Sequence, residues 1–143
     1  MDINLKSVFQ ITKELTDLLK KGKSPNIINI SSIYGVVAPD LNIYKSTKIF
    51  NPAAYSVSKS ALIHFTKWLA SNLSPYIRVN CVSLGGIERG QKNLFKKNYV
   101  KTTLTKRMCK EEDVIGSIIF LSTTMSSYIT GQNIIIDGGK TII

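Results

Sequence analysis

Tyr55 and Lys59 lie four positions apart in the segment Tyr55-Ser56-Val57-Ser58-Lys59, the part of the sequence best suited to acid–base chemistry. In a helix, residues four apart share one face, about one turn from each other. A tyrosine is a poor proton donor at neutral pH because its reference pKa is about 10, and a neighbouring ammonium favours the phenolate. The pair indicates a general acid or base, although this spacing alone is more often a solvated helix pair.

Two hydroxyl groups stand at a second position suited to chemistry. Ser31 and Ser32 follow the short apolar run of residues 26–30, which reads as a strand. Open α/β sheets place their sites at the carboxyl ends of their strands. A serine at such an end can donate a hydrogen bond to a substrate oxygen on which charge develops.

The elements that must position these side chains alternate along the chain. Apolar residues at helical spacing predict helices over 2–20, over 53–73 after Pro52, and over 111–122, whereas short apolar runs predict strands at 26–30, 77–82 and 133–136. This alternation is typical of a parallel sheet with crossover helices. The predicted fold class is α/β.

Together these features resemble the short-chain dehydrogenase/reductase family, in which a Ser, a Tyr-x-x-x-Lys pair and a helix Asn form a catalytic tetrad. The resemblance extends along essentially the whole chain. Besides the Tyr/Lys segment, four segments match in order: Asn4-Leu5-Lys6-Ser7-Val8-Phe9, Ile28-Asn29-Ile30-Ser31-Ser32, Ile77-Arg78-Val79-Asn80-Cys81-Val82-Ser83, and Thr130-Gly131-Gln132 through Asp137-Gly138-Gly139.

The resemblance implies an oxidoreductase that reduces a carbonyl group or oxidises a secondary alcohol. Tyr55 would be the general acid or base, and Lys59 would make it a usable one. Ser32, a better match than Ser31, would hydrogen-bond the substrate oxygen. Asn4 would position a water that links Lys59 to solvent.

The resemblance also implies a cofactor, NAD or NADP. Lys59 would bind the nicotinamide ribose beside Tyr55, and Gly85, Gly86 and Ile87 would face the nicotinamide. Leu84 stands where the family usually has the proline that precedes this turn, so the backbone is expected to be less restrained there.

Only the C-terminal half of a family member is matched. The expected fold is a Rossmann-like, doubly wound parallel sheet truncated to its last three strands, with residues 1–143 forming part of one domain. A Gly-rich turn that holds the pyrophosphate has no counterpart, so we expect no useful NAD(P) binding by this chain alone. We also expect an open edge at residues 26–30 and an uncovered apolar face, an aggregation liability. The chain would be half of a split enzyme, a truncated gene or a partial gene model.

Charge is concentrated in one stretch. The chain carries a net +10, and residues 89–110 hold eight basic residues and no acid, which leaves +2 for the remainder. This stretch falls where the family has its mobile substrate lid, so Lys96 and Lys97 are candidates to attract an anionic substrate; the alternative is a solvated lysine-rich loop. The loop before Tyr55 is longer than in compact family members, and with Tyr34, Tyr44 and Phe50 among its residues it either walls a substrate pocket or is a surface excursion.

Several function classes are disfavoured. No apolar run reaches the length of a membrane helix, the first twenty residues do not form a signal peptide, and no nucleic-acid-binding motif is present. Cys81 and Cys109 lack metal-ligand spacing and His64 has no partner, which predicts no metal site and favours a reduced, cytoplasmic setting. The helices over 2–20 and 53–73 resemble the family's dimer helices. They predict a homo-oligomer and allow a second reading, a non-catalytic relic that acts by dimerising with full-length relatives.

Overall fold

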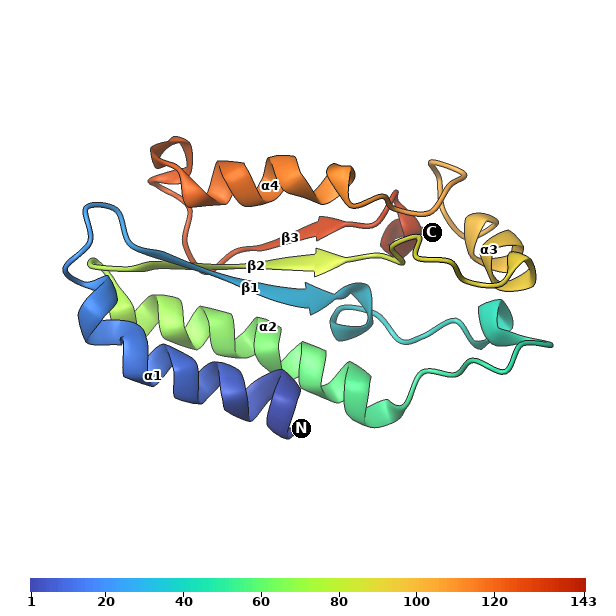
Figure 1. Cartoon of the computed structure of the whole chain (residues 1–143), viewed down its shortest axis with the longest axis horizontal. Helices are drawn as coiled ribbons and strands as arrows, with labels where there is room; N and C mark the ends of the chain where they lie inside the picture. Colours follow the sequence, from blue (N-terminus) through green and yellow to red (C-terminus); the bar gives the residue numbers. More distant parts are fainter.

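Three parallel strands form the middle layer of the molecule. The computed structural model describes all 143 residues, and its sheet has the strand order β1-β2-β3. Helices α1 and α2 lie on one face of the sheet and α4 lies on the other (Figure 1). The predicted α/β class and the three-strand sheet with crossover helices are confirmed. The elements are α1 (Ser7–Leu19), β1 (Asn26–Ser32), α2 (Ala53–Leu73), β2 (Arg78–Leu84), α3 (Asn93–Val100), α4 (Glu112–Ser122) and β3 (Asn133–Ile136).

Strand β2 is the most deeply buried strand because it is paired on both sides and covered on both faces. It pairs with β1 from Asn26↔Arg78 to Ser32↔Leu84 and with β3 from Cys81↔Asn133 to Leu84↔Ile136. Its burial includes polar side chains, since Asn80 and Ser83 are as deeply buried as Val79 and Cys81. One core cluster joins α2 to this strand and is made of Leu69, Ala70, Ile77 and Val79.

Arg78, the first residue of β2, contacts the segment that connects α4 to β3. Its guanidinium donates to the carbonyl oxygens of Leu121 at 3.1 Å and Ser126 at 3.0 Å. The first of these carbonyls belongs to the last turn of α4, where helix carbonyls lack partners within the helix. Arg78 thereby fixes the connection from α4 to β3.

Helix α3 was not predicted. Residues 89–110 read as a basic loop, yet Asn93–Val100 is helical, with Phe95 and Tyr99 buried one turn apart. Two apolar anchors in eight residues give only a weak periodic signal, so packing against the rest of the domain determines this helix.

The edge of the sheet formed by β1 is open, as expected. β1 pairs with β2 alone, and Ile30 on that strand is 42% exposed. Ile30 also lines an apolar hollow of about 370 Å³ with Ile115 and Ile119 of α4. Backbone groups and apolar side chains at such an edge are available to another strand.

Gly35 allows the segment after β1 to lie directly on α2. A Cβ at this position would lie 2.7 Å from the backbone carbon of Lys59 and 2.8 Å from the Ser60 nitrogen. Backbone atoms in a helix cannot yield without moving the helix. The absence of a side chain at Gly35 therefore sets the distance between the serine strand and the helix that carries Tyr55.

We predict that Gly35→Ala lowers the free energy of unfolding by about 1–3 kcal/mol, because the added methyl group forces the segment away from α2. Denaturant titration followed by circular dichroism measures the change. Gly116→Ala is the matched control, since Gly116 lies in α4 with open space around it; it should raise the same quantity by about 0.5–1 kcal/mol. An unaltered Gly35→Ala variant would contradict the close approach.

Candidate active site

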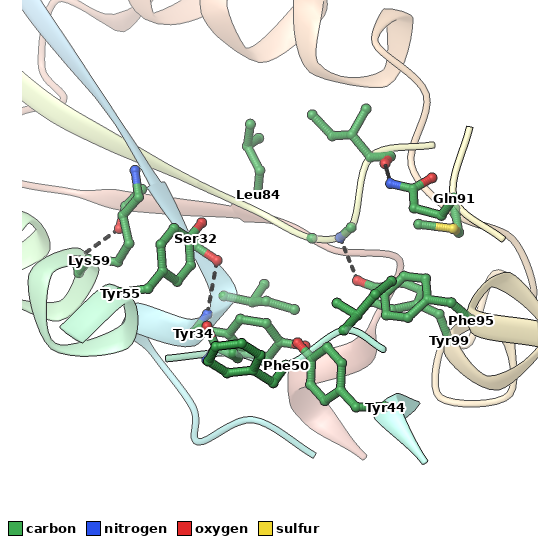
Figure 2. Close-up of a pocket in the computed structure, with 18 of the residues that line it drawn as sticks. Ser32, Tyr34, Tyr44, Phe50, Tyr55, Lys59, Leu84, Gln91, Phe95 and Tyr99 are labelled. Carbon is green, nitrogen blue, oxygen red and sulfur yellow. Dashed lines mark hydrogen bonds between the residues drawn. The ribbon is translucent and has the colours of Figure 1, made fainter. Parts of the chain in front are cut away.

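A cavity of about 550 Å³ opens at the carboxyl ends of β1 and β2. The sequence candidates Ser32, Tyr34, Tyr55, Lys59, Gly85, Gly86 and Ile87 all line it. Tyr55 and Ser32 both line this cavity, together with Phe95 and Tyr99, and all four are labelled in Figure 2. Residues from three separate segments therefore meet at the carboxyl ends of the strands, where α/β proteins place their sites.

Helix α2 presents Tyr55 and Lys59 on one face. The helix begins at Ala53, so Tyr55 lies in its first turn, and the Lys59 ammonium is 5.8 Å from the centre of the Tyr55 ring. The same ammonium donates a hydrogen bond of 2.9 Å to the Ile30 carbonyl. Burial lowers the pKa of the Lys59 ammonium below its ordinary value, because a partly desolvated cation is less stable.

The Ile30 carbonyl that Lys59 binds points to the unpaired side of β1, away from β2. The Arg78 amide donates to the Pro25 carbonyl, and Ile30 is the register partner of Val82. In a parallel ladder a residue that faces its neighbour bonds to the two residues flanking its register partner. Val82 faces β1, so the N–H and C=O of Ile30 itself point to the open edge. The Lys59 ammonium therefore donates to a backbone carbonyl that a further strand at this edge would otherwise bind.

Two serines at the end of β1 have different partners. Ser31 Oγ donates to the Lys59 carbonyl at 2.9 Å, so this hydroxyl anchors α2 to the strand. Ser32 is buried, and its Oγ accepts a hydrogen bond from the Tyr34 amide at 3.2 Å, as Figure 2 shows. The Ser32 hydroxyl keeps its own proton for another acceptor. This geometry favours Ser32 as the serine that contacts substrate.

Asn4 lies outside the cavity lining. It belongs to a π-helical turn, Asp2–Lys6, that precedes α1, and its Nδ2 donates to Ser58 Oγ at 3.1 Å. Ser58 in turn donates to the Tyr55 carbonyl at 2.7 Å. Asn4 thus contacts the Tyr55 helix through Ser58, and its connection to Lys59 through a water stays a prediction.

The turn after β2 is restrained without the proline. The Gly86 amide donates to Tyr99 Oη at 2.5 Å, and a Cβ on Gly86 would lie 2.8 Å from the Tyr99 ring. The Gly85 amide donates to the Ile136 carbonyl at 2.8 Å, and the Cys109 amide to the Gly86 carbonyl at 3.1 Å. The looser backbone expected from Leu84 is thus counteracted by Tyr99 and by pairing on both sides.

Sequence reasoning missed the part of the lining that comes from the basic stretch. Phe95, Tyr99 and the amide of Gln91 line the cavity together with Tyr34, Tyr44 and Phe50 of the loop before Tyr55. The spacing of Phe95 and Tyr99 was an available signal, but it stood within a stretch dominated by its charge. Residues of the loop before Tyr55 line the cavity, and the role of this loop in binding substrate stays a prediction.

The basic candidates lie elsewhere. Neither Lys96 nor Lys97 is among the cavity-lining residues. Lys96 pairs with Glu88 at 2.7 Å, and this contact holds the pKa of the Glu88 carboxyl below its usual range. Two other cations of the stretch also pair with acids just beyond it, Arg89 with Glu111 and Arg107 with Asp113. The charge of residues 89–110 is thus partly neutralised and lies outside the cavity.

Known proteins share both the sequence and the fold. A family model described as enoyl-(acyl carrier protein) reductase matches residues 1–141. The chain is 36% identical over 140 residues to post-translational flagellin modification protein A of Campylobacter coli, covering 97% of this chain and 55% of that protein. It is 34% identical over 149 residues to the 3-oxoacyl-(acyl-carrier-protein) reductase FabG of Thermotoga maritima, covering 99% and 56%.

A solved short-chain dehydrogenase of Leptospira borgpetersenii with bound NAD+ has the same fold, with a TM-score of 0.87 and 43% identity over 97% of this chain and 54% of that one. The chain therefore spans about half the length of the relatives it matches. Because the family model covers nearly every residue and the solved relative covers almost as many, this chain belongs to the short-chain dehydrogenase/reductase family.

Proposed function

We propose that this chain carries the catalytic half of an NAD(P)-dependent oxidoreductase that reduces a carbonyl group or oxidises a secondary alcohol. The observation that supports it most directly is the convergence of Ser32, Tyr55 and Lys59 in one cavity beside the Gly85–Gly86 turn. A hydroxyl donor, a phenol and an ammonium at one strand end are suited to moving a proton to or from a substrate oxygen.

In the reduction, Ser32 would donate a hydrogen bond to the carbonyl oxygen, and Tyr55 would transfer its proton to that oxygen as negative charge develops there. A nicotinamide, when bound, supplies the hydride that the carbonyl carbon gains, and it accepts that hydride in the reverse direction. Lys59 would stabilise the Tyr55 phenolate left after proton transfer. Alcohol oxidation runs through the same groups, with Tyr55 as the base.

The chain offers a partial fit for the dinucleotide. Tyr55, Lys59, Gly85, Gly86 and Ile87 all line the cavity and would hold the nicotinamide and its ribose. No Gly-rich turn in this chain is available for the pyrophosphate. We propose that the segment corresponding to the other half of the relatives supplies it, and that this chain alone binds NAD(P) only weakly.

A fusion protein tests the reaction. Joining the N-terminal half of the Thermotoga maritima reductase to this chain should produce oxidation of NADH or NADPH by generic ketones, followed by nicotinamide absorbance. Tyr55→Phe should lower kcat at least about 100-fold, because it removes the hydroxyl group that transfers the proton and leaves the ring in place. Tyr128→Phe is the matched control expected to retain turnover, since Tyr128 is fully exposed and lies outside the cavity lining. A Tyr55→Phe fusion with undiminished kcat would sink the proposed role of Tyr55.

Lys59 also generates a pH prediction. Because folding lowers the pKa of its ammonium, the unfolded chain holds more protons between the lowered value and the ordinary value of 10.5. The free energy of unfolding therefore rises with pH in that window. Denaturant titrations should show the wild type gaining on Lys59→Met as the pH climbs toward 10.5, with a constant difference at lower pH. A difference that is flat throughout, or that shrinks, would contradict this sign.

The outer face of α1 and α2 supports a homo-oligomer. An apolar groove of about 600 Å³ runs between the two helices, with Phe9, Phe65 and Trp68 in its lining. The Phe9 and Phe65 rings are 5.8 Å apart, and Trp68 stacks on Phe65 at 5.9 Å. Exposed aromatic side chains that form one continuous patch are typical of an interface. A second copy that presents the same patch would bury it.

We predict that Phe9→Glu shifts the chain toward the monomer in sedimentation equilibrium, because Phe9 is 49% exposed and would place a charge in the interface. Tyr128→Glu is the control, since Tyr128 is fully exposed and lies outside the groove; its oligomeric state should match the wild type. A wild type that is already monomeric would exclude the proposed oligomer.

Two further findings bear on the setting. No helix of the structure has both the length and the apolar character that a membrane crossing requires. Both cysteines are free thiols. Free thiols fit the reducing cytoplasm, which we propose as the place of action.

A further inference from the structure

We propose that the cavity accepts an uncharged carbonyl compound whose body is a hydrocarbon ring, and that it discriminates against carboxylates and phosphates. The inference rests on the proposed function, because the cavity is the one that holds Tyr55. It replaces the anionic substrate that the basic stretch suggested.

Aromatic rings from two segments form one wall of the cavity. Phe95 of α3 stands between Tyr44 and Tyr99, with ring centres 5.9 Å from each. Tyr34 joins the group through a hydrogen bond of 2.9 Å from Tyr44 Oη to Tyr34 Oη. Phe50 lines the same cavity, and Figure 2 shows Phe95, Tyr99 and Tyr44 at the side of the view opposite Lys59. A ring is the substrate shape that gains most from stacking or edge contacts with such a wall.

The cavity has almost no charge to offer. Its lining contains no acid, and its one cation, Lys59, donates to the Ile30 carbonyl. Lys140 lies behind the wall, with its ammonium 5.0 Å from the Tyr99 ring centre, but it lines a separate cavity and donates to Thr102. The cations of α3 lie outside the cavity as well. An anion bound at the aromatic wall would therefore lose water without gaining a paired cation.

The polar groups on the wall are neutral hydroxyls. Burial raises the pKa of both Tyr34 and Tyr99, so both phenols stay protonated at physiological pH. Tyr34 accepts from Tyr44, and Tyr99 accepts from the Gly86 amide, which leaves each with a proton to donate. A neutral carbonyl or hydroxyl group is satisfied by such donors, whereas burying an ionised group beside them costs far more than burying a neutral one.

Acetophenone and para-acetylbenzoate test the inference on the chain as it exists, since they differ only by a carboxylate. Titration followed by amide NMR should show acetophenone shifting the Gly85 and Gly86 resonances. Its dissociation constant should be at least about tenfold below that of para-acetylbenzoate. Phe50→Ala should weaken acetophenone binding severalfold without harming the fold, because Phe50 is 76% exposed at the rim.

Lys96→Gln and Lys97→Gln are the matched controls, and they should leave both dissociation constants unchanged. Equal or tighter binding of para-acetylbenzoate, or no response of Gly85 and Gly86 to acetophenone at about 10 mM, would overturn the inference. Neither readout involves hydride transfer. If acetophenone binds as expected while the fusion protein oxidises no cofactor, the proposed reaction is wrong and the ligand preference stands. If the fusion protein turns over and prefers carboxylates, the proposed reaction stands and the ligand preference is wrong.

Discussion

The contact between the end of β1 and the second turn of α2 is the constraint on which the site depends. Ser31 Oγ binds the Lys59 carbonyl at 2.9 Å, the Lys59 ammonium binds the Ile30 carbonyl at 2.9 Å, and Gly35 leaves no space between its segment and the helix backbone. These contacts fix the position of α2, and therefore of Tyr55, relative to Ser32. If the helix slid along the strand, the distance between the Tyr55 phenol and the Ser32 hydroxyl would change although both residues would keep their secondary structure.

Much of this arrangement was predictable because it is local. Helix α2 and strand β3 occupy the predicted residues, 53–73 and 133–136, and Tyr55 and Lys59 needed only helical spacing to share a face. Ser32 followed from its place at a strand end. What joins the phenol to the serine is packing between segments more than twenty residues apart, and only the family resemblance pointed to it.

The parts that could not be predicted are set by tertiary partners. Tyr99 restrains the Gly86 turn from a helix whose own eight residues carry little periodicity. The charge of residues 89–110 read as a free positive surface because its acidic partners, Glu88 and Glu111, stand just outside that stretch. Local composition does not show which charges pair with residues outside the stretch, or which side of a helix faces a cavity. It therefore suggested an anionic substrate, whereas the residues of this stretch that line the cavity include the aromatic Phe95 and Tyr99.

The hydrogen bond from the Lys59 ammonium to the Ile30 carbonyl connects the open edge of the sheet to the Tyr55/Lys59 pair. The Ile30 carbonyl points away from β2, and the Lys59 ammonium is its partner. A strand pairing at that edge needs the same backbone acceptors, since edge carbonyls are what a parallel neighbour binds. It would therefore compete with Lys59 for the Ile30 carbonyl, and the partly desolvated ammonium would lose this hydrogen-bond partner. The Tyr55 ring is 5.8 Å away. Pairing at the open edge and the position of the Lys59 ammonium therefore both depend on the Ile30 carbonyl oxygen.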